Sequence, residues 1–162
     1  MTHTFKTIDS PVGQLKLVAA GPKLVAILWE YDKPSRVRLG PMRESPQDPV
    51  LLRAEQQLRE YFAGARTRFD LELEFAGTDF QKNVWRALLD IPYGQTRSYA
   101  QIAAQIGRPK AVRAVGAANG RNPLSIVAPC HRVVGKSGEL TGYAGGLPAK
   151  QLLLALEGKP HA

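Results

Sequence analysis

The stretch RSYAQIAAQIGRPKAVRAVGAANGR, residues 97–121, contains two short helical patterns on either side of a tight turn. The first pattern places apolar side chains at helical spacing, at Ile102, Ala103 and Ile106. Residues 108–110, RPK, form the turn, and residues 111–121 indicate a second helix. Two short helices joined by about three residues are the outline of a helix-turn-helix. Such pairs more often serve packing than DNA contact, so this pattern alone predicts a fold and leaves the partner open.

Two further helices are predicted around this pair. Thr78 or Asp79 can cap a helix through FQKNVWRALLDI, which Pro92 and Gly94 end. A closing helix is predicted in AKQLLLALEG, residues 149–158, with three leucines facing inward, Leu152, Leu153 and Leu156. The Gly-rich loop before it lacks the GxxxxGK pattern that cradles phosphates. Residues 77–162 are therefore predicted to form a mostly helical C-terminal domain.

The first half of the chain has a different pattern. The first thirty residues predict a β-meander with one buried face, because alternating apolar runs are separated by turn residues. Residues 32–47 are rich in Pro and Arg and indicate an exposed loop. A helix is predicted from Asp48 to Gly64, followed by a strand in RFDLELEF, residues 68–75. Residues 1–76 are thus predicted to form a small α+β domain that serves as a scaffold, and the fold class of the whole chain is α+β.

Length and composition exclude several classes of protein. The chain has 162 residues, of which 44% are hydrophobic and 22% charged, as in a globular protein. Its single cysteine excludes an internal disulfide framework and a multi-cysteine zinc site, so no metal is expected. No signal peptide is evident, and the apolar runs are far shorter than the ~20 residues that a membrane span needs. These observations predict a cytoplasmic protein without a membrane partner.

The positive charge is concentrated in the second half. Residues 1–77 carry 11 Lys and Arg against 10 Asp and Glu, whereas residues 78–162 carry 11 against 4. The formal net charge of +8 therefore lies almost entirely in the half with the helix-turn-helix pattern. A field of this kind favours a polyanionic partner, with nucleic acid first and a membrane surface or an acidic protein behind it. The simpler interpretation is that the excess of cations keeps the protein soluble.

The only cysteine, Cys130, lies in SIVAPCHRVVGKSG, residues 125–138, between apolar segments that indicate buried strand. A reactive thiol needs its thiolate stabilised by a neighbouring base or cation, and His131 and Arg132 follow directly. Adjacency alone is weak evidence, because consecutive strand residues point to opposite faces. A lone cysteine before a histidine is most often simply buried, and a lone glutamate at a helix end, such as Glu157, is most often exposed. Only the joint pattern favours chemistry here.

Four motifs together carry a family resemblance. PCHRVVG is preceded by Asn122 and Pro123 and followed by GYAGG and LLALEG, and the match begins at GTDFQKNVWRAL. In this combination the sequence resembles the O6-alkylguanine-DNA alkyltransferases and is most similar to the bacterial Ogt type. The resemblance covers about half of the chain, from the helix after Gly77 to Gly158. Residues 1–76 are compatible with the family's more variable first domain.

The resemblance implies a DNA repair reaction that each molecule performs once. Cys130 takes the alkyl group from O6-alkylguanine after the base has flipped out of the duplex, and it keeps the group, so no cofactor is implied. In the family the matching Cys, His and Glu are linked through a water, which makes His131 the base and Glu157 its orienter. Such an enzyme is a methylated-DNA–protein-cysteine methyltransferase. Its activity on O4-alkylthymine is left open.

The resemblance also assigns roles outside these three residues. Tyr99 matches a tyrosine that hydrogen-bonds the flipped base and supplies a proton, although on sequence alone it is equally a half-buried core residue. Arg113 matches an arginine that enters the stack where the nucleotide has left, and Asn122 matches a turn asparagine that braces the segment before the active site. The remaining matches are Ala114, Gly116 and Ala117 on a helix that the family places in the minor groove, Val133, Tyr143 and Ala144 in the base pocket, and Gly145 and Gly146 beside it.

The expected partner is double-stranded DNA containing O6-alkylguanine, bound by a protein that is monomeric in solution, with cooperative assembly on DNA left open. The family's structural zinc and its added Cys-rich domain are excluded by the single cysteine. A non-repairing branch carries Trp at the cysteine position, and Cys130 places this chain on the reactive side. Two rival hypotheses remain: a lesion-binding protein without transfer, and a cysteine hydrolase that turns over many times.

Overall fold

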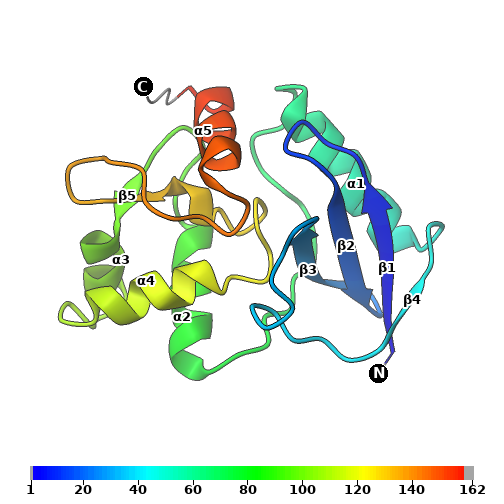
Figure 1. Ribbon diagram of the computed structural model, residues 1–162, viewed down its shortest axis with the longest axis horizontal. Helices are drawn as coiled ribbons and strands as arrows, with labels where there is room; N and C mark the ends of the chain where they lie inside the picture. The colour runs from blue at the N-terminus through cyan, green and yellow to red at the C-terminus, as the bar shows by residue number, and fades with distance from the viewer. Residues whose placement is uncertain (1, 159–162) are drawn as a thin grey trace. The chain divides into compact units, whose positions relative to one another are not determined.

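A computed structural model describes residues 2–158 and divides the chain into two compact units at residues 75 and 76 (Figure 1). The first unit contains a four-stranded sheet and one long helix. The second contains four helices and a two-stranded sheet. The predicted α+β class, with a helix-turn-helix in the second half, is confirmed. No helix among the described residues is long and apolar enough to span a membrane.

The sheet of the first unit begins with the predicted meander. Strands β1 (His3–Ile8), β2 (Leu15–Ala20) and β3 (Lys23–Trp29) pair antiparallel in succession. A fourth strand, β4 (Met42–Glu44), pairs parallel to β1 and gives the order β3-β2-β1-β4. The prediction of an exposed loop over 32–47 is therefore incomplete: residues 42–44 form a strand, because the free edge of β1 offers hydrogen bonds that they use.

Helix α1 (Pro49–Phe62) packs against β1, β2 and β3 (Figure 1). It starts as the sequence predicts: the Asp48 side chain accepts a hydrogen bond from the Val50 N–H, and Pro49 occupies the first turn, where its missing N–H costs nothing. The helix contributes Leu51, Leu58 and Tyr61 to the core, all fully buried. The second side of the sheet is also partly covered, because Leu39 and Met42 pack on a cluster that includes Val18 and Ala26. The expectation of one buried face is thus incomplete.

The strand predicted over residues 68–75 is not formed as a ladder. Leu73 makes a single bridge to Leu24, through hydrogen bonds from Leu24 N–H to the Glu72 carbonyl and from Glu74 N–H to the Leu24 carbonyl. The alternation that predicted a strand is nevertheless real in burial, since Leu71, Leu73 and Phe75 are half-buried and the glutamates between them exposed. The segment pairs with the edge strand β3 at one residue only. Alternating apolar and polar residues show which side chains are buried, but they do not show how many residues pair with a neighbouring strand.

The second unit begins with the predicted helices. α2 (Asp79–Leu89) has Thr78 as its N-cap, and α3 (Tyr99–Gln105) has Ser98; in both, a glutamine three residues later completes a capping box. α3 and α4 (Val112–Gly120) contact each other across the turn at 106–111 and form the helix-turn-helix. The Trp85 indole N–H donates to the Ala118 carbonyl at 2.8 Å and ties α2 to α4.

Helix α5 (Leu147–Leu156) closes the unit and starts two residues earlier than predicted. Its inward face is Ala149, Lys150, Leu153 and Leu154. The assignment of Leu152 to the inward face is wrong, because that side chain is 37% exposed, and Leu156 is only half-buried. The sequence LLLALEG offers four leucines around a helix, so spacing alone did not say which two face the core.

The segment around Cys130 is the clearest departure from the sequence-based expectation. No strand leads into the cysteine: residues 122–129 are irregular and entirely buried, and Cys130–Arg132 form one turn of 3-10 helix. Only β6 (Val133–Val134) is extended, and it pairs parallel with β5 (Arg97–Ser98). An apolar run predicts burial, but it does not distinguish a strand from buried irregular chain. The parallel pair brings the start of α3 beside the residues that follow Cys130.

Candidate active site

Cys130 lies in the interior of the second unit, with 2% of its surface exposed. Its N–H donates to the Ala128 carbonyl at 2.7 Å, and its carbonyl accepts from Asn119 of α4 at 3.5 Å. Because the 3-10 turn replaces a strand, Cys130, His131 and Arg132 all lie inside the fold instead of alternating between two faces. In a strand, Cys130 and His131 would point to opposite faces, but in this turn both side chains are buried.

His131, Arg132 and Glu157 form a buried cluster between this turn and the end of α5. His131 Nε2 lies 2.8 Å from Glu157 Oε2. Arg132 holds the same carboxylate with two donors, Nε to Oε1 at 2.8 Å and Nη2 to Oε2 at 3.0 Å, and its Nη1 donates to the Ile91 carbonyl at 2.6 Å. The Glu157 side chain is 1% exposed. The sequence suggested Arg132 only as a cation next to the thiol, and its pairing with Glu157 was not predicted.

The charges of this cluster fix the protonation of His131. Burial lowers the pKa of His131 below 6.5, against the opposing hydrogen bond to Glu157, so the imidazole is neutral near pH 7. An ionised carboxylate only accepts hydrogen bonds, so the proton of the neutral ring sits on Nε2 and faces Glu157. The lone pair is therefore on Nδ1, which is buried and has no hydrogen-bond partner among residues 2–158. This nitrogen is available to accept a proton.

Lys150 is a second buried cation that the sequence did not reveal. Its Nζ donates to the Val133 carbonyl at 2.7 Å and lies within 3.4 Å of the carbonyl and 3.3 Å of the hydroxyl of Thr141. Burial lowers its pKa to about 8, while the negative charge of an ionised Cys130 acts in the opposite direction. A lysine in the middle of LPAKQLL is ordinarily a surface residue, and only its position on the inward face of α5 would have marked it.

Tyr99 reaches the same region from a distant part of the sequence. It follows β5 directly, and the ladder to β6 places this strand next to Val133. Its hydroxyl hydrogen-bonds to that of Thr141. A Cβ atom on Gly116 of α4 would lie 3.8 Å from the Tyr99 ring, so α4 also passes close to this side chain.

Asn122 braces the buried segment before Cys130. Its Nδ2 donates to the Ala128 carbonyl at 2.8 Å, and its Oδ1 accepts from the Leu124 N–H at 3.0 Å. Between them, Ile126 has a φ of 75°, a left-handed conformation that is rare for a β-branched residue. The two hydrogen bonds span this strained residue and fix the path of the chain into the cysteine.

The other predicted residues fall into two groups. Arg113, Ala114 and Ala117 lie on the exposed side of α4, whereas Val115 and Ala118 are buried on the other side. Val133 is buried three residues after Cys130. Tyr143 and Ala144 are half-buried in the loop before α5. This loop ends at Gly146, which has a φ of 92° and precedes the first residue of the helix. Of the residues predicted for DNA binding, Arg113, Ala114 and Ala117 are thus exposed on α4, whereas Gly116 is half-buried and Asn122 is fully buried after the helix.

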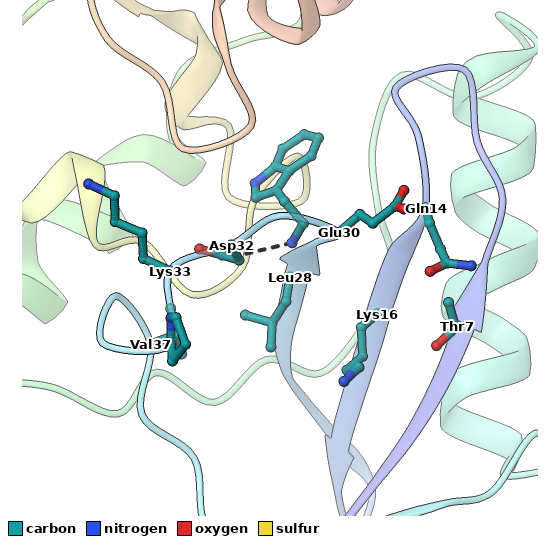
Figure 2. A pocket seen from close by; sticks show the side chains of 10 residues that line it. Thr7, Gln14, Lys16, Leu28, Glu30, Asp32, Lys33 and Val37 are labelled. Carbon is teal, nitrogen blue, oxygen red and sulfur yellow. Dashed lines mark hydrogen bonds between the residues drawn. The ribbon is translucent and has the colours of Figure 1, made fainter.

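A cavity of about 270 Å³ opens in the first unit, between the sheet and the loop after β3 (Figure 2). Charged side chains of both signs surround it, among them Lys16, Glu30, Asp32 and Lys33. Asp32 is committed to structure there: its carboxylate accepts from the Trp29 N–H at 3.2 Å and pairs with Arg36 at 2.6 Å. None of the residues predicted for the site lines this cavity.

Comparison with known proteins accounts for both units. The model of the 6-O-methylguanine DNA methyltransferase DNA-binding domain matches residues 79–159, and that of the ribonuclease-like domain of the same methyltransferase matches residues 4–75. The chain belongs to the 6-O-methylguanine DNA methyltransferase family.

Members of this family are similar over nearly the whole length. A methylated-DNA–protein-cysteine methyltransferase of Mycobacterium bovis is 53% identical, with 97% of this chain and 93% of the relative covered. The crystal structure of Mycobacterium tuberculosis O6-methylguanine methyltransferase superposes with a TM-score of 0.86 at 50% identity, covering 99% of this chain and 96% of that one. A structure of Mycobacterium tuberculosis OGT in complex with DNA has a TM-score of 0.85 at 47% identity, covering 100% and 96%. The family resemblance seen in the motifs is confirmed.

Proposed function

We propose that the protein repairs O6-alkylguanine in DNA by transferring the alkyl group to Cys130, once per molecule. The observation that carries this proposal is the buried cluster beside the only thiol. The carboxylate of Glu157 fixes the proton of His131 on Nε2, which leaves the Nδ1 lone pair free to receive the proton of Cys130. Family membership and the matching near-full-length relatives support the same reaction.

The transfer step needs a strong, soft nucleophile, because it breaks an ether-like bond at carbon. The thiol proton passes to His131 Nδ1, through the bridging water that the resemblance implies. The Cys130 thiolate then attacks the alkyl carbon from the side opposite the guanine oxygen: the S–C bond forms, the C–O6 bond breaks, and its electron pair stays on the purine. Lys150 supports the negative sulfur, because its interaction with an ionised Cys130 is attractive.

The departing guanine leaves as an anion and needs a proton. Tyr99 lies in the same part of the second unit, and we propose that its hydroxyl supplies this proton. The product is a neutral thioether on Cys130. A thioether is a poor leaving group and the mechanism offers no acceptor for its alkyl group, so the reaction ends after one transfer and requires no cofactor.

Binding of DNA is assigned to the second unit. Its excess of cations favours the phosphate backbone, and the exposed side of α4 carries Arg113 among small residues that suit a narrow minor groove. The alkylated oxygen is inaccessible inside a duplex, so the base must flip out, and Arg113 fills its place in the stack. Tyr143, Ala144 and the backbone of Val133 then form the walls of the base pocket. We expect a monomer in solution and a reducing compartment, the cytoplasm, in which the thiol survives.

A titration tests the proposal against its rivals. Duplex DNA with O6-methylguanine is added in increasing excess to a fixed amount of protein, and the lesions lost are counted. We expect one lesion lost per protein molecule and none with Cys130→Ala. A hydrolase would continue beyond one equivalent, and a lesion-binding protein would remove none. Either result contradicts the proposal.

A further inference from the structure

The hydroxyl of Thr141 lies between Tyr99 and Lys150. It hydrogen-bonds to the Tyr99 hydroxyl, and Lys150 Nζ lies 3.3 Å from its oxygen. Thr141 belongs to the loop between β6 and α5 and is half-buried, so three separate elements meet at this one oxygen: the start of α3, the loop and the inward face of α5. Neither the sequence motifs nor the reaction as described above uses this residue.

The chemistry of the three groups fixes the direction of one hydrogen bond and favours one direction for the other. An ammonium group has three donors and no acceptor, so the Thr141 oxygen must accept from Lys150. Either hydroxyl can donate in the bond between Thr141 and Tyr99. An oxygen that already accepts from a cation becomes the stronger donor, so the arrangement in which the threonine hydrogen points to the oxygen of Tyr99 is favoured. The tyrosine oxygen accepts this bond, and its own hydrogen remains available for a third group. A series of hydrogen bonds that starts from a cation also polarises each following hydroxyl group, which makes the last hydroxyl a stronger donor.

We propose that Thr141 is a positioning residue that turns the hydroxyl hydrogen of Tyr99 toward the guanine. This proposal rests on the function proposed above and names how its proton donor is oriented. Without the threonine hydroxyl, the Tyr99 oxygen loses its partner and its hydrogen can point away from the base. Lys150 is the first donor in this series of hydrogen bonds.

Lys150 is suited to this role because it is held independently of the threonine side chain. The carbonyl of Val133 accepts from Nζ at 2.7 Å, and the backbone carbonyl of Thr141 lies 3.4 Å away. We therefore expect the ammonium to stay bound, and the fold to stay intact, when a methyl group replaces the Thr141 hydroxyl. With a pKa of about 8, the side chain is still mostly protonated near pH 7.

Four variants test the proposal in a single-turnover assay on duplex DNA with O6-methylguanine: Thr141→Val, Thr141→Ser, Tyr99→Phe and the double variant of Tyr99→Phe with Thr141→Val. Thr141→Val keeps the shape and removes the hydroxyl, and we expect transfer to slow about tenfold, the rate equivalent of one hydrogen bond. Thr141→Ser keeps the hydroxyl and should retain the rate of the unaltered protein. In a Tyr99→Phe background, Thr141→Val should cause less than about a twofold further loss, because the two changes remove the same interaction. Thr141→Ala replaces Thr141→Val if the latter melts at a lower temperature.

The double variant separates positioning from a merely structural role. A structural role would slow transfer equally with and without the Tyr99 hydroxyl, and this result overturns the proposal. So does an unchanged rate in Thr141→Val, or a rate in Thr141→Ser as low as that of Thr141→Val. The unaltered protein is measured in the same series, so an absence of transfer there refutes the proposed function itself and is distinguishable from failure of this inference.

Discussion

At the scale of single residues, the carboxylate of Glu157 is neutralised by a group that does not take part in the transfer. A buried carboxylate is costly unless it is paired and hydrogen-bonded, and Arg132 supplies two donors to it. This pairing offsets the cost of burying the carboxylate, while burial keeps His131 neutral near pH 7. In the proposed mechanism, a neutral His131 can accept the proton of Cys130.

Arg132→Met tests this pairing. The variant leaves the Glu157 charge buried without its counter-ion, so we expect a loss of about 3 kcal/mol in the free energy of unfolding, measured with urea. Transfer should also slow, because an uncompensated carboxylate draws a proton onto His131. The exposed pair of Arg53 and Asp70, with N–O distance 3.0 Å and side chains 59% and 84% exposed, gives a matched control. Arg53→Met should change neither quantity, and a similar loss in both variants would contradict the role of Arg132.

Acidification should destabilise the fold through His131. The pKa of His131 lies below 6.5 in the folded protein because the ring is buried, while the unfolded chain has the ordinary value of 6.5. Below about pH 6.5, His131 therefore binds more protons in the unfolded state than in the folded state. The stability that the neutral ring contributes above this pH is lost as the pH falls through the folded pKa. Thermal unfolding from about pH 7.5 to about pH 5.5 should shift less in His131→Gln than in the unaltered protein. Equal shifts would show that His131 is not neutral.

Sequence reasoning could find residues that belong to motifs and could not find those whose role depends on burial. Cys130, His131 and Glu157 stand in recognisable patterns. Lys150 carries a charge that is ordinarily solvated, and nothing local reveals that α5 faces inward at this position. Arg132 was visible as a cation next to the thiol, but not as the partner of a buried carboxylate from another element. Thr141 acquires its contacts only when three elements come together.

At the scale of elements, the segment from Asn122 to Cys130 is held against its own backbone strain. Ile126 has a φ of 75°, and conformations of this kind persist only where the surroundings impose them. The Asn122 side chain hydrogen-bonds to Leu124 before Ile126 and to Ala128 after it. The brace and the strained residue together determine where the thiol lies.

Asn122→Ala should therefore lower both stability and transfer. It leaves the Leu124 N–H and the Ala128 carbonyl without these bonds, and we expect about 2 kcal/mol lower unfolding free energy. Gln57 offers a matched control in the first unit, where its amide donates to the Asp70 carbonyl at 3.0 Å and accepts from the Asp70 N–H at 2.9 Å. Gln57→Ala should cost similar stability and leave the transfer rate of the folded protein unchanged. Equal loss of transfer in both variants would contradict the positional role of Asn122.

Elements with local signals were predictable, and elements that depend on distant partners were not. The starts of α1 and α2 were predictable because caps and prolines act within one turn. The strands expected at 68–75 and before Cys130 were wrong, because an apolar or alternating pattern does not say whether a neighbouring edge is available. The parallel pair of β5 and β6 joins residues 36 positions apart, from Arg97 to Val133, and is too short to leave a pattern.

At the scale of the whole molecule, the surplus of cations in residues 78–162 must offset the cost of flipping a base. Extrusion costs a few kcal/mol, and each phosphate that a cation neutralises releases counterions. The affinity for duplex DNA should consequently fall steeply with salt. The first half of the chain, with nearly balanced charges, contributes little to this dependence.

Arg113→Ala tests how the surface of α4 is used. If Arg113 fills the place of the flipped nucleotide, the variant should repair duplex DNA about tenfold more slowly, while repair of a single strand, which has no stack to fill, stays nearly unchanged. Stability should not change, because the side chain is exposed. Arg53→Ala, in the first unit, is the control and should affect neither substrate. Equal rates of Arg113→Ala and the unaltered protein on duplex DNA would contradict this role.

The most direct measurement follows the sulfur of Cys130 itself. The protein is incubated with duplex DNA containing O6-methylguanine, and its intact mass and peptide map are recorded. The account predicts that each molecule which repairs a lesion gains the mass of one CH₂ group, located on Cys130, and that further DNA adds nothing. Loss of the lesion with Cys130 unmodified, or with the added mass on another residue, would contradict it.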